Sequence, residues 1–425
     1  MKLAVVGSGI AGLSSAWLLS KQHDVTLFEA AAALGGHTNT VDVTIDGRTF
    51  PVDTGFLVCN TRTYPNLIAL FAHLGVTTVA SEMTFAVSME SPDLEWSGSN
   101  LATLFAQKRN LLRPGFWRMI QDFLRFNRET NEALPEISLG AYLDQHGYRQ
   151  EFREWYLLPM AAAIWSCPTK TMLDYPLSTF VRFCRNHGLL QVSDRPQWLT
   201  VQGGGREYVK KLVAGIGTVR LATPVQRVIT TAAGVSLRTA GGDEHFDAVV
   251  LACHSDQALA IRGDDSSALE REILGSVRYQ PNRAVLHTDS AILPRDPHVW
   301  SAWNYAAGPG TSGEQPVSVS YLINKLQPLP VATPVIVTLN PHREPMREKV
   351  LAEFDYAHPV FDQAAITAQA RLAALQGQRG VYYAGAWGGY GFHEDGLKSA
   401  LRVANALGVT APWQTTTDAA EACAA

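Results

Sequence analysis

The first thirty residues, MKLAVVGSGIAGLSSAWLLSKQHDVTLFEA, constrain the fold more than any other part of this chain. The valine-rich run at residues 3–6 is typical of a buried parallel strand, and apolar residues recur at helical spacing after Gly12. Residues 25–28 predict a second strand, which ends at Glu29. The glycine motif therefore stands at a strand–turn–helix junction, and it predicts a βαβ unit that binds a dinucleotide.

Each residue type in this motif has a physical role. Gly7 permits a tight turn, Gly9 lets the backbone approach a pyrophosphate, and Gly12 lets the helix pack closely on the strand. The free N–H groups at the start of the helix attract phosphate, and Glu29 is placed to accept hydrogen bonds from a ribose. Three such glycines also occur in ordinary loops, but the flanking strands, helix and acid favour the dinucleotide site.

Length and composition limit the remaining possibilities. With 425 residues, of which 46% are hydrophobic and 17% charged, the chain is long enough for two globular domains. The net charge of −4 gives no general attraction to nucleic acid. The five cysteines are scattered without metal-binding spacing, so we expect free thiols in a reducing cytoplasm and no metal site. We expect no signal peptide, because residues 3–6 already belong to the first strand, and no apolar run is long enough to cross a bilayer.

Later segments return to the dinucleotide unit. The stretch VDVTIDGRTFPVDTG predicts a hairpin, and FDAVVLAC predicts a strand that runs under the nucleotide. Near the C-terminus, VYYAGAWGGYGFHEDGLKSAL predicts a strand, a glycine-rich turn and a helix whose N-terminus can meet a second phosphate or a ribityl chain. An NAD dehydrogenase usually continues with further βα units. In this chain, the segments predicted to complete the nucleotide-binding fold after its second strand come much later in the sequence.

As an ordered set, these motifs resemble the FAD-dependent amine oxidase and phytoene desaturase superfamily. The matching residues are the GxGxxG motif with Glu29, the pair Gly35-Gly36, Asp53-x-Gly55, Val225 and the C-terminal YYAGAW…HEDGLKSA. More narrowly, HTDSAILP, WSAWNY, LINKLQ, VTLNP and GFHEDG resemble a bacterial subgroup. That subgroup is similar to the flavin domain fused to plant cyclopropane-fatty-acid synthases, and its genes are often found beside such synthases.

The resemblance implies an α/β fold, in which a Rossmann-like FAD-binding domain of the glutathione-reductase type is interleaved with a mixed α+β substrate domain. We expect the FAD domain at residues 1–80, 195–262 and 376–412, the substrate domain at 81–194 and 263–375, and a mobile tail at 413–425. The expected FAD contacts are Gly7, Ser8, Gly9, Ile10, Ala11, Gly12, Glu29, Ala30, Gly35, Gly36, His37, Asp53, Thr54, Gly55, Phe56, Val225, Ala252, Gly385, Ala386, Asp395, Gly396 and Leu397.

The chain also departs from the family pattern. Some amine oxidases attach the flavin through a cysteine near the final glycine-rich turn, but this chain has no cysteine there, so we expect non-covalent FAD. The lysine that amine oxidases commonly place near flavin N5 corresponds best to Arg283, and an aromatic cage residue corresponds to His393. Both differences argue against the oxidation of a simple amine.

The candidates for chemistry are His393, Glu394 and Arg283. His393 could move a proton or orient a substrate, and a packing role fits it equally well. Glu394 more simply favours a helix N-terminus, and Arg283 could bind a carboxylate or phosphate or lie on the surface. We expect an FAD-dependent oxidoreductase that desaturates or oxidises a lipophilic substrate, an unsaturated or methyl-modified fatty-acyl chain. The alternatives are a flavin amine oxidase and a non-catalytic flavoprotein partner of a lipid methyltransferase.

Residues 101–130 differ in composition from the rest of the chain. They combine large apolar side chains with six cations and two acids. Such a basic amphipathic surface is typical of contact with anionic headgroups, and equally of a helix packed on the substrate domain. We therefore expect a cytoplasmic protein that can contact the inner face of a membrane through this segment.

Overall fold

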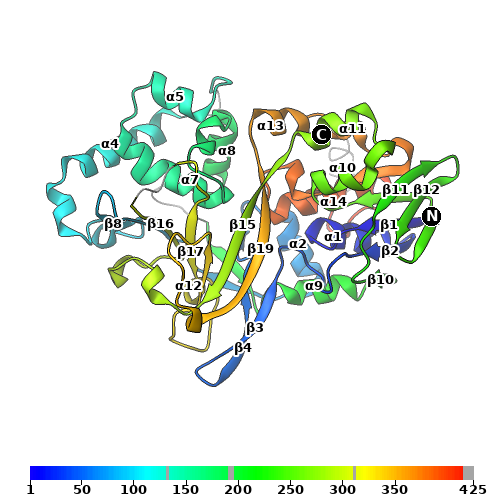
Figure 1. The fold of residues 1–425 in the computed structure, drawn as a ribbon, viewed down its shortest axis with the longest axis horizontal. Helices are drawn as coiled ribbons and strands as arrows, with labels where there is room; N and C mark the ends of the chain where they lie inside the picture. Colours follow the sequence, from blue (N-terminus) through cyan, green and yellow to red (C-terminus); the bar gives the residue numbers. More distant parts are fainter. Residues whose placement is uncertain (131–133, 190–195, 310–312, 415–425) are drawn as a thin grey trace.

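The computed structural model describes residues 1–130, 134–189, 196–309 and 313–414, and its centre is a parallel five-stranded sheet (Figure 1). In spatial order the sheet contains β10 (Thr218–Arg220), β2 (Asp24–Phe28), β1 (Lys2–Val6), β14 (Ala248–Leu251) and β20 (Val381–Tyr383). The predicted strands at residues 3–6, 25–28 and FDAVVLAC thus lie side by side. This arrangement confirms the predicted α/β class, with strands from distant parts of the chain in one sheet.

Two helices from opposite ends of the chain cover this sheet together. They are α1 (Ile10–Leu19) and α14 (His393–Ala406), which pack against each other. A methyl group added at Gly396 would lie 2.7 Å from Cγ2 of Ile10, so the close packing of the two helices requires glycine at that position. Gly396 therefore belongs to a helix–helix contact.

A second, seven-stranded sheet lies in the other half of the molecule, to the left of the first in Figure 1. Its order is β19 (Val350–Val360), β15 (Arg278–His287), β18 (Ile336–Leu339), β17 (Ser318–Leu322), β16 (Trp303–Ala307), β7 (Phe85–Met89) and β8 (Leu94–Ser97). Its strands pair antiparallel except for β16 with β7. Helices gather at one end of this half (Figure 1), among them α4 (Pro114–Glu129), α5 (Leu139–Gln145), α7 (Leu158–Trp165) and α8 (Leu177–Asn186).

Smaller elements connect the two halves. The predicted hairpin forms from β3 (Thr40–Ile45) and β4 (Arg48–Asp53), and Asp46 and Gly47 both adopt positive φ at its turn. Two three-stranded sheets contain β5 (Cys59–Asn60), β9 (Trp198–Val201) and β6 (Thr78–Ser81), and β11 (Arg227–Thr231), β12 (Gly234–Thr239) and β13 (Gly242–Phe246). The remaining helices are α2 (Pro65–Leu74), α3 (Leu101–Leu104), α6 (Gln150–Phe152), α9 (Arg206–Val213), α10 (Ser255–Arg262), α11 (Ala268–Gly275), α12 (Ile323–Leu326) and α13 (Gln363–Gln369).

The segment 413–425, expected to be a mobile tail, begins with a residue that contacts the folded body. Trp413 stacks on Trp17 of α1 with ring centroids 6.3 Å apart, so this residue belongs to the folded body. Residues 415–425 lie outside the described part of the chain. Within the described ranges, no helix is both long enough and apolar enough to span a bilayer.

Candidate active site

A cavity of about 830 Å³ begins at the carboxyl ends of the parallel strands and continues to the seven-stranded sheet. Val6 ends β1, Phe28 ends β2, and Ala252 and Gly385 follow β14 and β20; all four line the cavity. Ligands of open α/β sheets bind at this edge, where the loops after several parallel strands converge. The cavity therefore begins where the glycine motif predicts a dinucleotide.

Most of the predicted FAD contacts line this cavity. They are Gly7, Ser8, Gly9, Ile10, Ala11, Glu29, Ala30, Gly35, Gly36, His37, Thr54, Gly55, Phe56, Val225, Ala252, Gly385 and Ala386.

The backbone at this end leaves room for a bound group. A methyl group added at Gly9 would meet no atom within 4 Å, whereas one added at Gly12 would lie 1.8 Å from the carbonyl oxygen of Gly7. Gly9 thus faces open space, and Gly12 closes the turn against the strand, as predicted. In addition, Nε2 of His37 is buried and has no hydrogen-bond partner among the described residues. An open cradle beside an unsatisfied polar atom fits a bound cofactor.

Hydrogen bonds fix the carboxylate of Glu29 at the dinucleotide end of the cavity. Its Oε2 accepts hydrogen bonds from N (2.8 Å) and Oγ (2.6 Å) of Ser8, and its Oε1 accepts one from N of Ala31 (2.8 Å). These bonds fix the carboxylate beside the glycine turn. Its remaining lone pairs can accept the hydroxyl protons of a ribose.

Five predicted FAD contacts do not reach the cavity: Gly12, Asp53, Asp395, Gly396 and Leu397. Asp53 is buried, and it accepts hydrogen bonds from N of Gly205 (3.0 Å) and Nε2 of Gln327 (2.9 Å). Burial raises the pKa of its carboxyl to about 6. Asp53 therefore holds the β3–β4 hairpin to neighbouring segments.

The three contacts expected in α14 are displaced by about one helical turn. Asp395 accepts a hydrogen bond from N of Phe392 (3.0 Å) and so caps its own helix, while Leu397 is fully buried. The residues that line the cavity here are Gly391, Phe392 and His393. The helix packs on α1 through Gly396, which lies against Ile10 and Ala11.

Of the three candidates for chemistry, His393 alone lines the cavity. Its ring stacks on Phe56 with centroids 3.8 Å apart, and its Nε2 lies 2.9 Å from Oγ1 of Thr38 and 3.2 Å from the hydroxyl of Tyr208. Burial, reinforced by the neighbouring His37, lowers the pKa of His393 to about 3. His393 is therefore neutral at physiological pH.

Glu394 has a structural role. Its carboxylate accepts hydrogen bonds from N (3.1 Å) and Nδ2 (2.7 Å) of Asn66 and from N of Leu67 (2.9 Å). These backbone groups belong to the first turn of α2, whose N–H groups lack partners within the helix. Glu394 therefore caps a neighbouring helix and does not reach the cavity.

Of the two roles considered for Arg283, the structure agrees with the position on the surface. Its guanidinium pairs with Glu344 (2.8 Å) and Glu353 (2.9 Å), it is 39% exposed, and it lies away from the cavity. A guanidinium buried without an acid is costly, and the acids that satisfy Arg283 lie on the outer surface. The resemblance of this strand to the one that carries a lysine in amine oxidases gave no information about Glu344 and Glu353.

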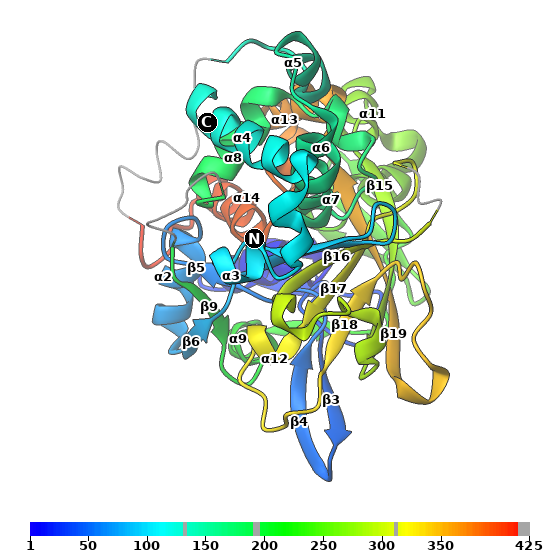
Figure 2. The ribbon, with the colours of Figure 1, turned by 90° about the vertical axis from the view of Figure 1, so that its left-hand side faces the viewer.

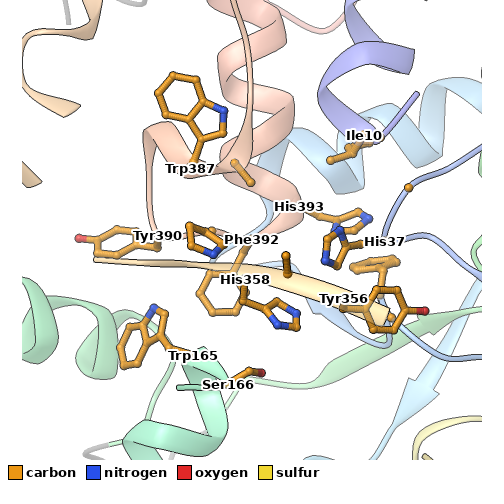
Figure 3. A pocket seen from close by; sticks show the side chains of 18 of the residues that line it. Ile10, His37, Trp165, Ser166, Tyr356, His358, Trp387, Tyr390, Phe392 and His393 are labelled. Carbon is orange, nitrogen blue, oxygen red and sulfur yellow. The ribbon is translucent and has the colours of Figure 1, made fainter. Parts of the chain in front are cut away.

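Many aromatic or titratable residues at the cavity were missed from the sequence, among them His254, Tyr279, Tyr356 and His358. Figure 3 shows His358 and Tyr356 near His37 and His393. The ring centroid of His37 lies 5.1 Å from that of Tyr356 and 5.2 Å from that of His358. Tyr356 and His358 stand two residues apart in β19 and so share a face, which was the one signal available in the sequence.

The protonation of His358 is determined by a chain of amides. N of Arg283 donates to Oδ1 of Asn340 (3.0 Å), Nδ2 of Asn340 donates to Oδ1 of Asn282 (2.6 Å), and Nδ2 of Asn282 contacts Nδ1 of His358 (2.8 Å). A backbone N–H can only donate, so the direction of every bond in the chain follows. Nδ1 of His358 accepts, and its proton is on Nε2. Burial lowers the pKa of His358 to about 3, so it offers the cavity a neutral N–H donor.

The rest of the cavity is apolar and mainly aromatic. Glu29 is the one carboxylate among the described residues of the lining, which includes no lysine or arginine. Among the described residues, no group of three or more His, Cys, Asp or Glu side chains is arranged to hold a metal ion. The apolar lining includes Met83, Phe85, Trp96, Tyr156, Met160, Ile164, Trp165, Phe183, Leu189, Trp198, Trp303, Tyr321, Leu339, Phe361, Tyr390 and Phe392.

Comparisons with known sequences agree with this site. A family model described as flavin containing amine oxidoreductase matches residues 10–322. A carotenoid phi-ring synthase of Chlorobaculum tepidum is 28% identical over 166 residues, which cover 36% of this chain and 23% of that protein. This chain therefore spans less than a quarter of the length of that relative.

Three solved structures share the fold. A protein assigned as a protoporphyrinogen oxidase of Exiguobacterium sp. 255-15 superposes with a TM-score of 0.69 at 17% identity, over 96% of this chain and 98% of its own. Cyclohexylamine oxidase of Brevibacterium oxydans IH-35A gives 0.66 at 16% identity, over 96% and 99%. A CLA-producing fatty acid isomerase of P. acnes gives 0.63 at 15%, over 94% and 96%. At these identities the likeness shows the fold alone.

Proposed function

Because the chain belongs to the family of flavin-containing amine oxidoreductases, we propose that it oxidises a lipophilic substrate, an unsaturated or methyl-modified fatty-acyl chain. Its cofactor is FAD, which when bound supplies the acceptor for a hydride removed from carbon. The observation that carries the substrate proposal is the lining of the cavity. Beyond the dinucleotide end it is mainly apolar and aromatic, with uncharged polar residues such as Thr84, Ser166 and His358. Its one described carboxylate, Glu29, lies at the dinucleotide end.

The chain provides what non-covalent FAD needs. The backbone around Gly9 leaves space for the pyrophosphate, the N-terminus of α1 favours its charge, and Glu29 is held for the ribose. Cys253 is the one cysteine among the described residues of the lining. Burial raises the pKa of its thiol to about 12, so this thiol stays protonated and is a poor nucleophile. We therefore expect acid precipitation of the protein to release intact FAD.

The charge of the cavity argues for a neutral, apolar substrate. A protonated amine or diamine would lose its hydration in this cavity and find no carboxylate in the substrate half to replace it. An acyl chain has no comparable hydration to lose, and aromatic side chains such as Trp165 and Phe183 bury it favourably. Solved structures with this fold include a fatty acid isomerase and a cyclohexylamine oxidase, so the fold accommodates both classes of substrate and the cavity must discriminate between them.

The neutral histidines would orient the polar part of such a substrate. His358 presents a fixed Nε2–H donor, which can bind a carbonyl or carboxylate oxygen. His393 is held between Thr38 and Tyr208, beside the start of α14. The surrounding aromatic side chains exclude water from the same space, which protects the reacting carbon from side reactions.

Anaerobic reduction of the bound flavin tests this proposal. The holoprotein is mixed, without oxygen, with detergent-dispersed phospholipids that carry unsaturated or methyl-branched acyl chains, and separately with cyclohexylamine and putrescine. We expect the flavin absorbance to bleach with an acyl lipid and to persist with the amines. Bleaching by an amine alone would show an amine oxidase. Flavin that stays oxidised with both classes would favour a non-catalytic partner of a lipid methyltransferase.

A matched pair of variants locates the substrate. Ile164→Asp places a carboxylate in the apolar part of the cavity, whereas Ile164→Leu preserves its character and volume. We expect Ile164→Asp to retain FAD and to lose bleaching by acyl lipid, because the ionised side chain disfavours the acyl chain. Ile164→Leu should behave as the wild type. Equal bleaching by all three proteins would exclude this part of the cavity as the acyl site.

A further inference from the structure

Exposed large apolar side chains gather on one segment of the described chain. In α3, the adjoining 3-10 segment Lys108–Leu112 and α4, the exposed residues are Leu101, Leu111, Leu112, Trp117 and Leu124. Leu101 is 75% and Leu112 is 88% exposed. The other exposed large apolar residues, Met1, Leu221, Met346 and Leu351, come from scattered positions in the sequence. Exposed large apolar residues concentrated in one segment point to a site of interaction.

We call these five residues, together with Lys108 and Arg128, the docking face. Figure 2 shows α3 and α4 on the side turned toward the viewer, which is the left-hand end of the molecule in Figure 1. The five-stranded sheet lies toward the opposite end, with β1 and β2. The docking face is thus remote from the glycine motif.

Within the docking face, the residues of α4 divide into an exposed outer side and a buried inner side. Along α4, Trp117, Leu124 and Arg128 are exposed at helical spacing, while Phe116 and Phe126 are buried beneath them. The indole Nε1 of Trp117 donates a hydrogen bond to the carbonyl oxygen of Leu111 (2.9 Å), which holds the two apolar side chains at one place. The helix is therefore amphipathic, and its outer side carries Trp117 and Leu124 among polar residues.

Cations lie among these apolar side chains. Lys108 is exposed and makes no ion pair within the part of the chain that the structure describes. Arg128 pairs with Glu129 at 3.7 Å, and its side chain is 75% exposed. Arg113 instead donates to the carbonyl oxygen of Asp93 (3.1 Å), and Arg118 and Arg125 pair with Glu151 and Glu129. Lys108, which has no ion pair there, and Arg128, which is the most exposed of the paired arginines, are therefore the cations most accessible to an external anion. The other arginines stabilise the segment through their internal bonds.

The docking face adjoins the cavity. Gly98 lines the cavity and stands three positions before Leu101 (101 − 98), where the docking face begins. On the inner side of α4, Phe123 packs edge-on against Tyr156 with centroids 4.9 Å apart, and Tyr156 lines the cavity. The helix α4 thus separates the exposed apolar side chains of the docking face from the apolar cavity.

We propose that the docking face binds the surface of a membrane that contains anionic phospholipid, so that an acyl chain passes from the bilayer into the cavity without crossing water. Exposed leucines and a tryptophan with cations among them match acyl chains bordered by anionic headgroups. This proposal rests on the proposed function, because the closeness of the docking face to the cavity serves the reaction only if the substrate is an acyl chain. The binding itself is tested without turnover.

Sedimentation with vesicles tests the binding. The holoprotein is centrifuged with vesicles of phosphatidylcholine alone or mixed with phosphatidylglycerol, at low and high salt. We expect it to pellet with the anionic vesicles at low salt and to be partly released as salt rises, because salt screens Lys108 and Arg128. We expect Leu112→Glu combined with Leu124→Glu to reduce vesicle partition at least about tenfold, since two leucines no longer enter the apolar phase.

The matched control is Met346→Glu combined with Leu351→Glu, which adds the same charge at exposed apolar residues elsewhere. We expect it to pellet as the wild type does. A wild-type protein that stays in solution with anionic vesicles at low salt would overturn the proposal, as would equal losses in the two double variants. The flavin spectrum and bleaching by detergent-dispersed acyl lipid should be the same in all three proteins. If that bleaching fails while vesicle binding follows the expected pattern, the proposed function is wrong and the docking face stands.

Discussion

At the scale of single residues, the glycines of the first turn have separable roles. Gly9 borders open space and Gly12 touches the carbonyl oxygen of Gly7. We therefore expect Gly9→Val to fold with an unchanged circular-dichroism spectrum but to be isolated without yellow FAD, because the side chain occupies the space of the pyrophosphate. Gly12→Ala should instead lower the melting temperature of the protein, because its Cβ clashes with backbone. A yellow Gly9→Val protein would contradict the assignment of this cradle.

At the scale of elements, three strands of the second sheet cooperate to set one tautomer. Asn282 in β15, Asn340 after β18 and His358 in β19 form the amide chain. We expect ¹⁵N spectra of histidine-labelled protein to show His358 protonated on Nε2 and free of titration above about pH 4, because burial lowers its pKa. Asn282→Ala should weaken this tautomer preference while FAD stays bound. Protonation on Nδ1, or titration near the ordinary histidine pKa of 6.5, would contradict the assignment.

At the scale of the whole molecule, buried histidines make stability depend on pH. Burial lowers the pKa of five histidines to about 3 or 4, so below pH 6.5 the unfolded chain binds protons that the folded protein does not. Each such histidine costs about 1.4 kcal/mol of stability per pH unit in that range. The five are His37, His187, His287, His358 and His393.

Two buried carboxyls act in the opposite direction. Burial raises the pKa of Asp53 and Asp395 to about 6, so between about pH 6 and their ordinary pKa of 3.8 the folded protein binds protons that the unfolded chain lacks. The five histidines outnumber them, and acidification is therefore destabilising overall. We expect the melting temperature, followed by circular dichroism at constant ionic strength, to fall by at least about 5 °C between pH 7 and pH 5.5. A constant or rising melting temperature over this interval would contradict the prediction.

The sequence by itself determined the dinucleotide half of the site. Gly7, Gly9, Gly12 and Glu29 act within one strand–turn–helix–strand unit, so their spacing was sufficient to place them. Such features are local, because hydrogen bonding and sterics between near neighbours decide them. The parallel strand before Ala252 was predictable for the same reason, since a continuous apolar run is typical of a strand buried on both faces.

Only the tertiary structure decided the substrate half. His358 and Tyr356 reach the cavity because β19 crosses the molecule beside it, and Arg283 stays outside because Glu353 of the same paired strands neutralises it at the surface. Glu394 caps α2, a helix more than three hundred residues away in sequence. Contacts between residues so distant in sequence depend on how whole sheets and helices pack together. The spacing of residues within one segment does not predict that packing.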